Sequence, residues 1–203
     1  MALRRRRIWK TSIGSACAAG GLRFNISHTR GLVACAIAYR ELGVDEESAD
    51  RSTDIDIADI VFAPEEVSIV KSAHHERQRC LFFRFWTLKE AFIKATGEGP
   101  RRPLDSFSFG LDPVRLKFHA ERHSGSHPGD PDGWQFAEYR PLPNRHLALA
   151  FRHTPSRPVR LDVRAARPEE IIPTYYSVVS RHPPSREEAR PDWRAFYLSA
   201  VIS

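Results

Sequence analysis

Long apolar runs and cysteine pairs are both scarce in this sequence of 203 residues. No apolar stretch approaches the ~20 residues that span a bilayer, so we expect no membrane span. The three cysteines, Cys17, Cys35 and Cys80, are odd in number and lack the spacing of metal or redox motifs. This pattern favours a reducing compartment over a disulfide framework, and we expect a cytoplasmic protein.

Acidic residues are absent before Glu41. Residues 1–21 combine the basic cluster Arg4–Arg7 with small residues, and Arg-rich, acid-free segments are typical of mitochondrial transit peptides. A mitochondrial location is therefore the alternative, and a poorly ordered tail is the other interpretation of this segment. The whole chain carries a net charge of +6, dominated by arginine, which favours phosphate-bearing partners. Because no nucleic-acid-binding motif is recognisable, we expect no nucleic acid partner.

Alternating residues and short apolar runs predict a series of strands. The expected strands cover 22–28, 32–39, 42–47, 107–111, 114–118, 134–139 and 146–151. Residues 48–58 are polar and acidic, which is typical of a loop. Pro64, with Glu65 and Glu66 behind it, predicts a helix start, and that helix is expected to continue to about Arg77.

Helices flanked by antiparallel strand pairs indicate an α+β fold, with an antiparallel sheet and helices packed on one side. We expect three parts along the chain. Residues 1–21 form a basic, poorly ordered segment, and residues 22–153 form the folded domain. Residues 154–203 form a Pro-rich tail that packs loosely or is disordered, with at most a short element at 171–179.

Residues 85–97 have the clearest helical pattern in the chain. They are rich in good helix formers and end at Gly97, a residue type that commonly terminates helices. Glu90 and Lys94 lie one turn apart on the same face of this helix. The plain interpretation is an amphipathic helix from about Gln78 with one Glu–Lys pair.

Carboxylates also gather at the end of the strand expected over 42–47. Because side chains alternate along a strand, Asp45 and Glu47 should project together and Glu46 away from them. Two such carboxylates repel one another unless a cation lies between them, and oxygen ligands suit Mg²⁺. The alternative is a solvated acidic loop.

Two further groups could join this site. Ser27 and His28 stand at a strand-to-turn junction, although a lone histidine is more often a surface or structural residue. Glu90 could supply a third carboxylate, and the neighbouring Lys89 and Lys94 could hold phosphates. Together these residue types predict a magnesium site beside a polyphosphate site.

These groups lie in blocks whose order and spacing hold over about residues 22–152. The blocks are Phe24–His28, Gly43–Glu47, Phe62–Glu66, Trp86–Gly97, Pro103–Phe107, Trp134–Phe136 and His146–Ala150. The pattern Trp-x-x-Lys-Glu-Ala-x-x-Lys, preceded by Asp-x-Glu at this distance, is highly specific. In these blocks the chain resembles the Sfp-type 4'-phosphopantetheinyl transferases.

The resemblance implies an enzyme that moves the phosphopantetheine arm of coenzyme A to a serine of an acyl or peptidyl carrier protein. Adenosine 3',5'-bisphosphate is the expected second product, and the carrier proteins serve fatty-acid, polyketide, nonribosomal peptide or lysine biosynthesis. By motif, Asp45, Glu47 and Glu90 would hold Mg²⁺. Lys94 and Lys89 would contact coenzyme A phosphates, and Ser27 with His28 would lie near the phosphate end of the nucleotide.

Two of these residues are the catalytic candidates. Glu90 could take the proton from the carrier serine, directly or through water. Lys94 could neutralise the leaving bisphosphate as its charge develops.

Typical Sfp-type enzymes have two similar halves with the active site between them. Residues 22–39 resemble only the last strands of the first half, so the expected fold is one complete lobe plus the last strands of the other. Three interpretations are open. The chain is an incomplete gene product, or it assembles into a homo-oligomer with shared sites, or it is a degenerate paralogue that binds carrier protein or coenzyme A without catalysis.

Overall fold

The computed structural model describes residues 16–17, 21–119, 130–153, 159–166 and 196–202. The strands are β1 (Ala16–Cys17), β2 (Arg23–Thr29), β3 (Leu32–Ala38), β4 (Leu42–Ser48), β5 (Phe107–Gly110), β6 (Arg115–Phe118), β7 (Trp134–Tyr139), β8 (Arg145–Arg152), β9 (Leu161–Ala166) and β10 (Phe196–Ile202). The α-helices are α1 (Ala58–Val61), α2 (Pro64–Ser72) and α3 (His75–Thr96). Short 3-10 turns lie at Ile55–Ile57, Gly99–Arg101, Leu104–Ser106 and Pro131–Gly133.

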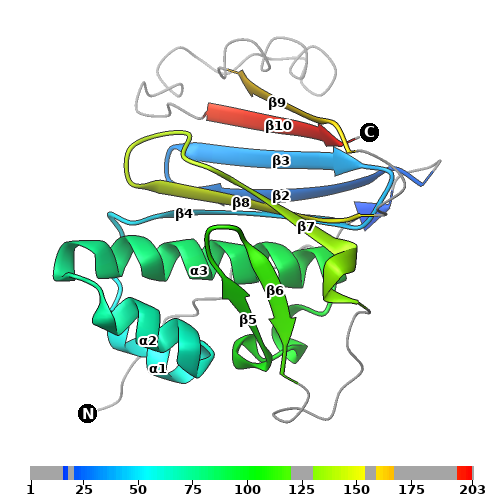
Figure 1. Cartoon of the computed structure of the whole chain (residues 1–203). Helices are drawn as coiled ribbons and strands as arrows, with labels where there is room; N and C mark the ends of the chain where they lie inside the picture. Colours follow the sequence, from blue (N-terminus) through cyan, green and yellow to red (C-terminus); the bar gives the residue numbers. More distant parts are fainter. Residues whose placement is uncertain (1–15, 18–20, 120–129, 154–158, 167–195, 203) are drawn as a thin grey trace, which may run out of the picture.

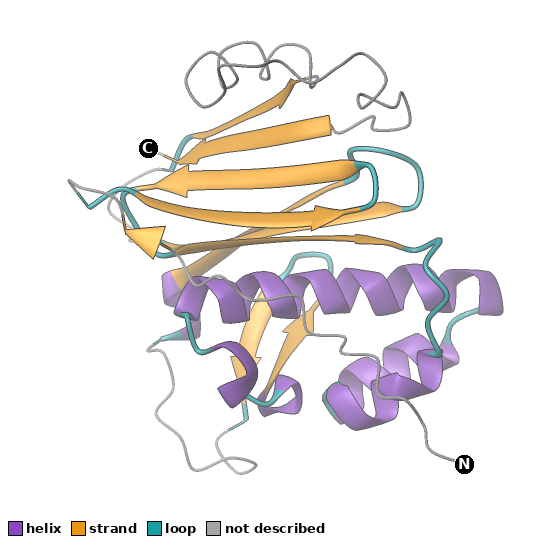
Figure 2. Ribbon diagram, turned by 180° about the vertical axis from the view of Figure 1, so that it is seen from behind, coloured by secondary structure: helices purple, strands orange, loops and turns teal. Residues whose placement is uncertain are grey.

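The described strands form two sheets and a separate hairpin. The first sheet has the order β1-β2-β3-β10-β9, the second has the order β4-β8-β7, and β5 pairs with β6. Helix α3 lies along the second sheet, while the first sheet lies on the opposite side (Figure 1). Figure 2 shows that α1, α2 and the β5–β6 hairpin lie on the side of α3 that faces away from the two sheets. The α+β prediction, with helices on one side of an antiparallel sheet, is therefore confirmed.

Two apolar cores hold these layers together, one on each face of the second sheet. Both faces are apolar because successive side chains along a strand point to opposite faces. Ala148 and Ala150 of β8 pack with the side chains of α3 in one core. Leu147 and Leu149 pack in the other core, with small residues of β3. On α3, the predicted apolar face is confirmed, since Phe85, Leu88 and Phe92 are fully buried.

The structure corrects the predicted boundary between two helices. Helix α2 ends at Ser72 rather than near Arg77, because Ala73 is extended with φ −75° and ψ 153°. The side-chain amide of Gln78 donates to the carbonyls of Lys71 (3.2 Å) and Ala73 (3.1 Å). These bonds satisfy carbonyl groups that a helix end leaves without partners. Helix α3 therefore begins earlier than predicted, at His75.

The segment 48–58, predicted as a loop, contains helical turns near its end. Asp54 caps the 3-10 turn at Ile55–Ile57, and its carboxylate accepts the backbone N–H of Asp56 at 3.1 Å. Helix α1 then begins at Ala58. Within the described residues, no helix combines the length and the apolar character that crossing a bilayer requires.

The Pro-rich tail contributes two strands, contrary to the prediction that it packs loosely or is disordered. Strand β10 runs parallel to β3, and β9 pairs antiparallel with β10. The edge of β3 is thereby covered (Figure 1). The short element expected at 171–179 lies outside the described residues. So does most of the segment 1–21, although Ala16 and Cys17 pair with β2.

Gly43 allows α3 to lie directly on β4. A Cβ atom at Gly43 would meet the backbone oxygen of Ala91 at 2.1 Å and the backbone nitrogen of Ala95 at 2.5 Å. Because neither atom can move without displacing the helix, we expect Gly43→Ala to lower the free energy of unfolding by about 3 kcal/mol. Urea denaturation measures this loss. Gly110→Ala is the matched control, since its Cβ would meet nothing closer than 4.0 Å, and an equal loss in both variants would contradict the prediction.

Candidate functional site

Asp45 and Glu47 project together toward α3, as the alternation of strand residues predicts. Glu46 points the other way, where its carboxylate accepts hydrogen bonds from Thr29 Oγ1 and from Arg145 Nη1 (3.1 Å). Asp45 is 4% exposed and Glu47 is 6% exposed. The alternative of a solvated acidic loop is therefore wrong, and the two carboxylates lie in a largely desolvated site.

A hydrogen-bond network at Asp45 joins β2, β4 and α3. Lys94 Nζ donates to Asp45 Oδ1 (2.7 Å) and to the carbonyl of Val44 (3.1 Å). Ser27 Oγ donates to the same Asp45 oxygen (3.0 Å) and accepts the backbone N–H of Glu46 (3.1 Å). Lys94 thus neutralises Asp45, and its contact with a coenzyme A phosphate stays a prediction.

Glu90 belongs to the same electrostatic cluster. It lies one helical turn before Lys94 on the same face of α3. Burial, together with the nearby charges of Asp45 and Glu47, raises the pKa of Glu90 to about 7 against the opposing charge of Lys94. The structure therefore brings together the three predicted carboxylates. One of them, Glu90, has a pKa close to neutral pH.

The residue types of this cluster fit a divalent cation. Asp45 Oδ2 is buried and has no hydrogen-bond partner among the described residues. Three carboxylates face Lys94, and Arg51 Nη1 lies 3.5 Å from Glu47 Oε2, so the cluster still carries excess negative charge when all three carboxylates are ionised. In the described part of the chain, no three His, Cys, Asp or Glu side chains are arranged as a metal site as they stand. The fit to Mg²⁺ thus rests on the donor chemistry and on the unpartnered oxygen.

Lys89 does not reach this cluster, which corrects its predicted contact with coenzyme A phosphates. Its side chain is fully buried on another face of α3, where Nζ pairs with Glu66 Oε2 at 2.9 Å. Nζ also donates to the carbonyls of Leu104 (2.7 Å) and Phe107 (2.6 Å). All three ammonium hydrogens therefore have acceptors within the core, and Lys89 is a structural residue.

His28 also lies apart from the carboxylates. It follows Ser27 on β2, so its side chain projects to the opposite face, and it is exposed whereas Ser27 is buried. The structure thus brings Ser27 but not His28 to the cluster. A role for His28 near the nucleotide phosphate stays a prediction.

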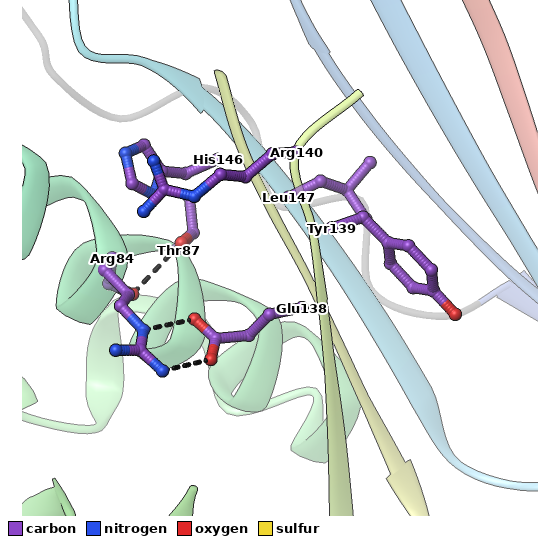
Figure 3. A pocket seen from close by; sticks show the side chains of 7 residues that line it. All are labelled: Arg84, Thr87, Glu138, Tyr139, Arg140, His146 and Leu147. Carbon is purple, nitrogen blue, oxygen red and sulfur yellow. Dashed lines mark hydrogen bonds and ion pairs between the residues drawn. The ribbon is translucent and has the colours of Figure 1, made fainter. Parts of the chain in front are cut away.

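A pocket next to the cluster contains residues to which the sequence had assigned no role. It is lined by Arg84, Thr87, Glu138, Tyr139, Arg140, His146 and Leu147 (Figure 3). His146 stands directly opposite Glu47 in the β4–β8 ladder. No sequence signal identified this pocket, because it depends on the pairing register of strands about 100 residues apart.

Comparison with known proteins places this site in a family. The model of the 4'-phosphopantetheinyl transferase superfamily matches residues 41–150. The 4'-phosphopantetheinyl transferase HetI of Nostoc sp. is 38% identical over 107 residues, which cover 52% of this chain and 45% of HetI. A 4'-phosphopantetheinyl transferase of Bacillus subtilis is 42% identical over 96 residues, which cover 47% of this chain and 40% of that protein. The solved holo-[acyl-carrier-protein] synthase of Thermotoga maritima aligns with a TM-score of 0.45 and 17% identity, covering 66% of this chain and 73% of that one.

The chain spans less than half the length of these two curated relatives. The family match nevertheless covers more than half of the 203 residues. It includes all of β4 and α3, which carry the three clustered carboxylates and Lys94. The chain belongs to the 4'-phosphopantetheinyl transferase superfamily.

Proposed function

We propose that this protein transfers the 4'-phosphopantetheine group of coenzyme A to a serine of an acyl or peptidyl carrier protein, with Mg²⁺ as cofactor. The observation that carries the proposal is the cluster of buried Asp45 and Glu47 with half-buried Glu90 beside Lys94. The cluster lies inside the part of the chain that matches the family model. Adenosine 3',5'-bisphosphate is the second product.

The proton affinity of Glu90 suits a general base. In the metal-free chain, Glu90 has a pKa of about 7, so it is partly ionised at neutral pH and binds a proton more strongly than an ordinary glutamate does. Glu90 therefore accepts the proton of the serine hydroxyl as the hydroxyl attacks phosphorus. Ser27 and Lys94 hold the Asp45 carboxylate in place through Oδ1 and leave Oδ2 open.

Asp45, Glu47 and Glu90 are the residues that would hold Mg²⁺. When bound, the ion supplies Lewis-acid polarisation of the pyrophosphate oxygens. Lys94 pairs with Asp45 at the same site, and in this proposal its charge also offsets the negative charge that develops on the leaving phosphate.

The transfer reaction itself tests the proposal. The purified chain is incubated with an apo carrier domain, coenzyme A and Mg²⁺, and intact-mass spectrometry follows the carrier. We expect the carrier to gain the mass of one phosphopantetheine, and we expect no gain in excess EDTA. A carrier that binds the chain but gains no mass would instead indicate a non-catalytic binding module.

Metal binding has a readout that does not depend on transfer. A ligand that binds the folded state stabilises it by mass action, so Mg²⁺ should raise the midpoint of thermal unfolding of the wild-type chain. Glu47→Gln should reduce this rise, because it removes one proposed ligand and leaves the Lys94–Asp45 pair intact. Differential scanning calorimetry with and without Mg²⁺ measures both. Asp162→Asn, at an exposed position on β9, is the matched control and should retain the full rise.

A further inference from the structure

Strand β4, which carries two of the three clustered carboxylates, is an edge strand of the second sheet as described. It pairs with β8 on one side, so the backbone groups on its other side need partners from elsewhere. Strand β2 of the first sheet lies against β4 (Figure 1). Among the described residues no backbone ladder joins these two strands, because they belong to different sheets. Their connection is made by side chains.

Three alternate residues of β2 direct their side chains toward β4, since every second residue of a strand shares a face. Asn25 Oδ1 accepts the backbone N–H of Val44 at 2.9 Å. Ser27 Oγ accepts the backbone N–H of Glu46 at 3.1 Å, and Thr29 Oγ1 donates to the Glu46 carboxylate. Asn25 and Ser27 are buried, so water has little access to these bonds. The three side chains form an inter-sheet ladder that takes the place of backbone pairing.

The inter-sheet ladder fixes the backbone on both sides of Asp45. The residue before it, Val44, is held through its N–H by Asn25 and through its carbonyl by Lys94 Nζ (3.1 Å). The residue after it, Glu46, is held through its N–H by the next member of the ladder. With both neighbouring peptide groups fixed, the Asp45 carboxylate can turn only about its own side-chain bonds.

Asn25 differs from the other two members in the group that it holds. Ser27 also bonds the Asp45 carboxylate, and Thr29 bonds a carboxylate on the opposite face of β4. Asn25 instead acts on the backbone immediately before Asp45. This hold matters because the like charges of Asp45 and Glu47 repel the carboxylate of α3 when no cation is bound. A fixed backbone opposes that repulsion and keeps the carboxylates together.

We propose that Asn25 is a positioning residue for the divalent cation, because its bond to the Val44 N–H holds the peptide group that precedes Asp45. The assignment rests on the proposed function, which places the cation at Asp45, Glu47 and Glu90. Asn25 is not itself a ligand and acts through β4. Partners that orient metal ligands typically contribute about 10–100-fold to metal affinity or activity. The contact between the two sheets thereby determines how tightly the site binds its cation.

Metal titrations without substrate test the assignment. The probe is Mn²⁺, which takes the same oxygen ligands as Mg²⁺ and gives an electron paramagnetic resonance signal when free in solution. The test variant is Asn25→Leu, which has the same number of heavy atoms and no acceptor. Thr29→Val is a control on the same strand, because Thr29 bonds the Glu46 side chain rather than the β4 backbone. Ser106→Ala is a second control, since the buried Ser106 hydroxyl donates to the Pro103 carbonyl (2.6 Å), outside β2 and β4.

We expect Asn25→Leu to raise the Mn²⁺ dissociation constant about tenfold, whereas Thr29→Val and Ser106→Ala keep the wild-type value. In transfer assays, Asn25→Leu should raise the apparent KM for Mg²⁺ and leave kcat at saturating Mg²⁺ nearly unchanged. A purely structural role would instead lower kcat through the folded fraction and leave KM unchanged. Circular dichroism first establishes that each variant is folded. If Asn25→Leu does not fold, Asn25→Ser replaces it with the same expected rise, because the serine hydroxyl is too short to reach the Val44 N–H.

Two results would overturn the assignment. One is a wild-type Mn²⁺ affinity in the folded Asn25 variant, and the other is an equal loss of affinity in that variant and in Ser106→Ala, which would indicate general destabilisation. Either result, together with normal phosphopantetheine transfer, would refute the role of Asn25 and leave the proposed function standing. A tenfold loss of affinity in a chain whose wild type transfers nothing would support the role of Asn25 and refute the catalytic function.

Discussion

Glu90→Gln should abolish most phosphopantetheine transfer while the protein stays folded. The substitution preserves the size of the side chain and removes the carboxylate that accepts the serine proton. General-base catalysis typically contributes about 10²–10⁴-fold to a rate, and we expect the transfer rate to fall within this range. Intact-mass measurement of the carrier over time gives the rate. Glu76→Gln is the matched control, since Glu76 is exposed in the first turn of the same helix.

The same substitution should stabilise the metal-free chain at alkaline pH. The pKa of Glu90 rises from an ordinary value of 4.5 to about 7 on folding, so the protonated form fits the native state. Its favourable contribution is complete below about pH 4.5 and is lost as the pH rises through about 7. Above pH 7 the buried carboxylate is ionised beside Asp45 and Glu47, and a neutral glutamine avoids that cost.

Urea denaturation in EDTA at pH 5 and pH 8 measures this effect. We expect Glu90→Gln to be more stable than the wild-type chain at pH 8 by an amount on the order of 2–3 kcal/mol, with a much smaller difference at pH 5. Full transfer activity of Glu90→Gln would refute the catalytic assignment. A loss of stability at both pH values would instead show that the carboxylate is a structural group.

Local periodicity predicted which members of the carboxylate cluster share a face of their own strand or helix. Asp45 and Glu47 share a face because a strand repeats every two residues, and Glu90 and Lys94 share a face because a helix repeats every 3.6 residues. The prediction also required these two faces to meet. They meet because Gly43 has no side chain, so the backbone of α3 can contact the backbone of β4. The sequence pattern alone did not indicate this contact.

Longer-range pairings account for the parts that the sequence did not reveal. His146 lies opposite Glu47 because of the β4–β8 register, which no local pattern encodes. Strand β10 pairs with β3 across more than 150 residues and follows a Pro-rich segment. The break between α2 and α3 falls at Ala73, and no Gly or Pro marks it in the sequence. The helical pattern of the sequence therefore continues across the break. For His146 and β10 the deciding contact is tertiary, and local propensity gives way to it.

The misassignment of Lys89 has the same origin and leads to the second large effect. Helical periodicity shows that Lys89 and Glu90 face different directions, but not which direction is filled by other parts of the chain. The 3-10 turn Leu104–Ser106 and β5 place their carbonyls above Lys89, and α2 places Glu66 there. Burial lowers the pKa of Lys89, whereas the charge of Glu66 opposes this change.

Lys89→Met should therefore unfold much of the protein rather than weaken coenzyme A binding. Removing one partner of a buried ion pair typically costs about 3–5 kcal/mol, because the other charge is left uncompensated. Here Glu66 would keep the backbone N–H groups of Ala63 (3.0 Å) and Phe109 (2.8 Å) but lose its cation. Urea denaturation of Lys89→Met measures the loss, and Lys117→Met, at an exposed lysine on β6, is the matched control.

A second substitution separates the structural role of Lys89 from a role in phosphate binding. Adding Glu66→Gln to Lys89→Met replaces the stranded charge with a neutral amide, so we expect the double variant to recover part of the lost stability. The folded fraction of either variant should show the wild-type KM for coenzyme A. If Lys89 contacted a phosphate, KM would rise several-fold at nearly unchanged stability. The two roles thus predict opposite changes in two separate measurements, and the buried ion pair with Glu66 predicts that only stability falls.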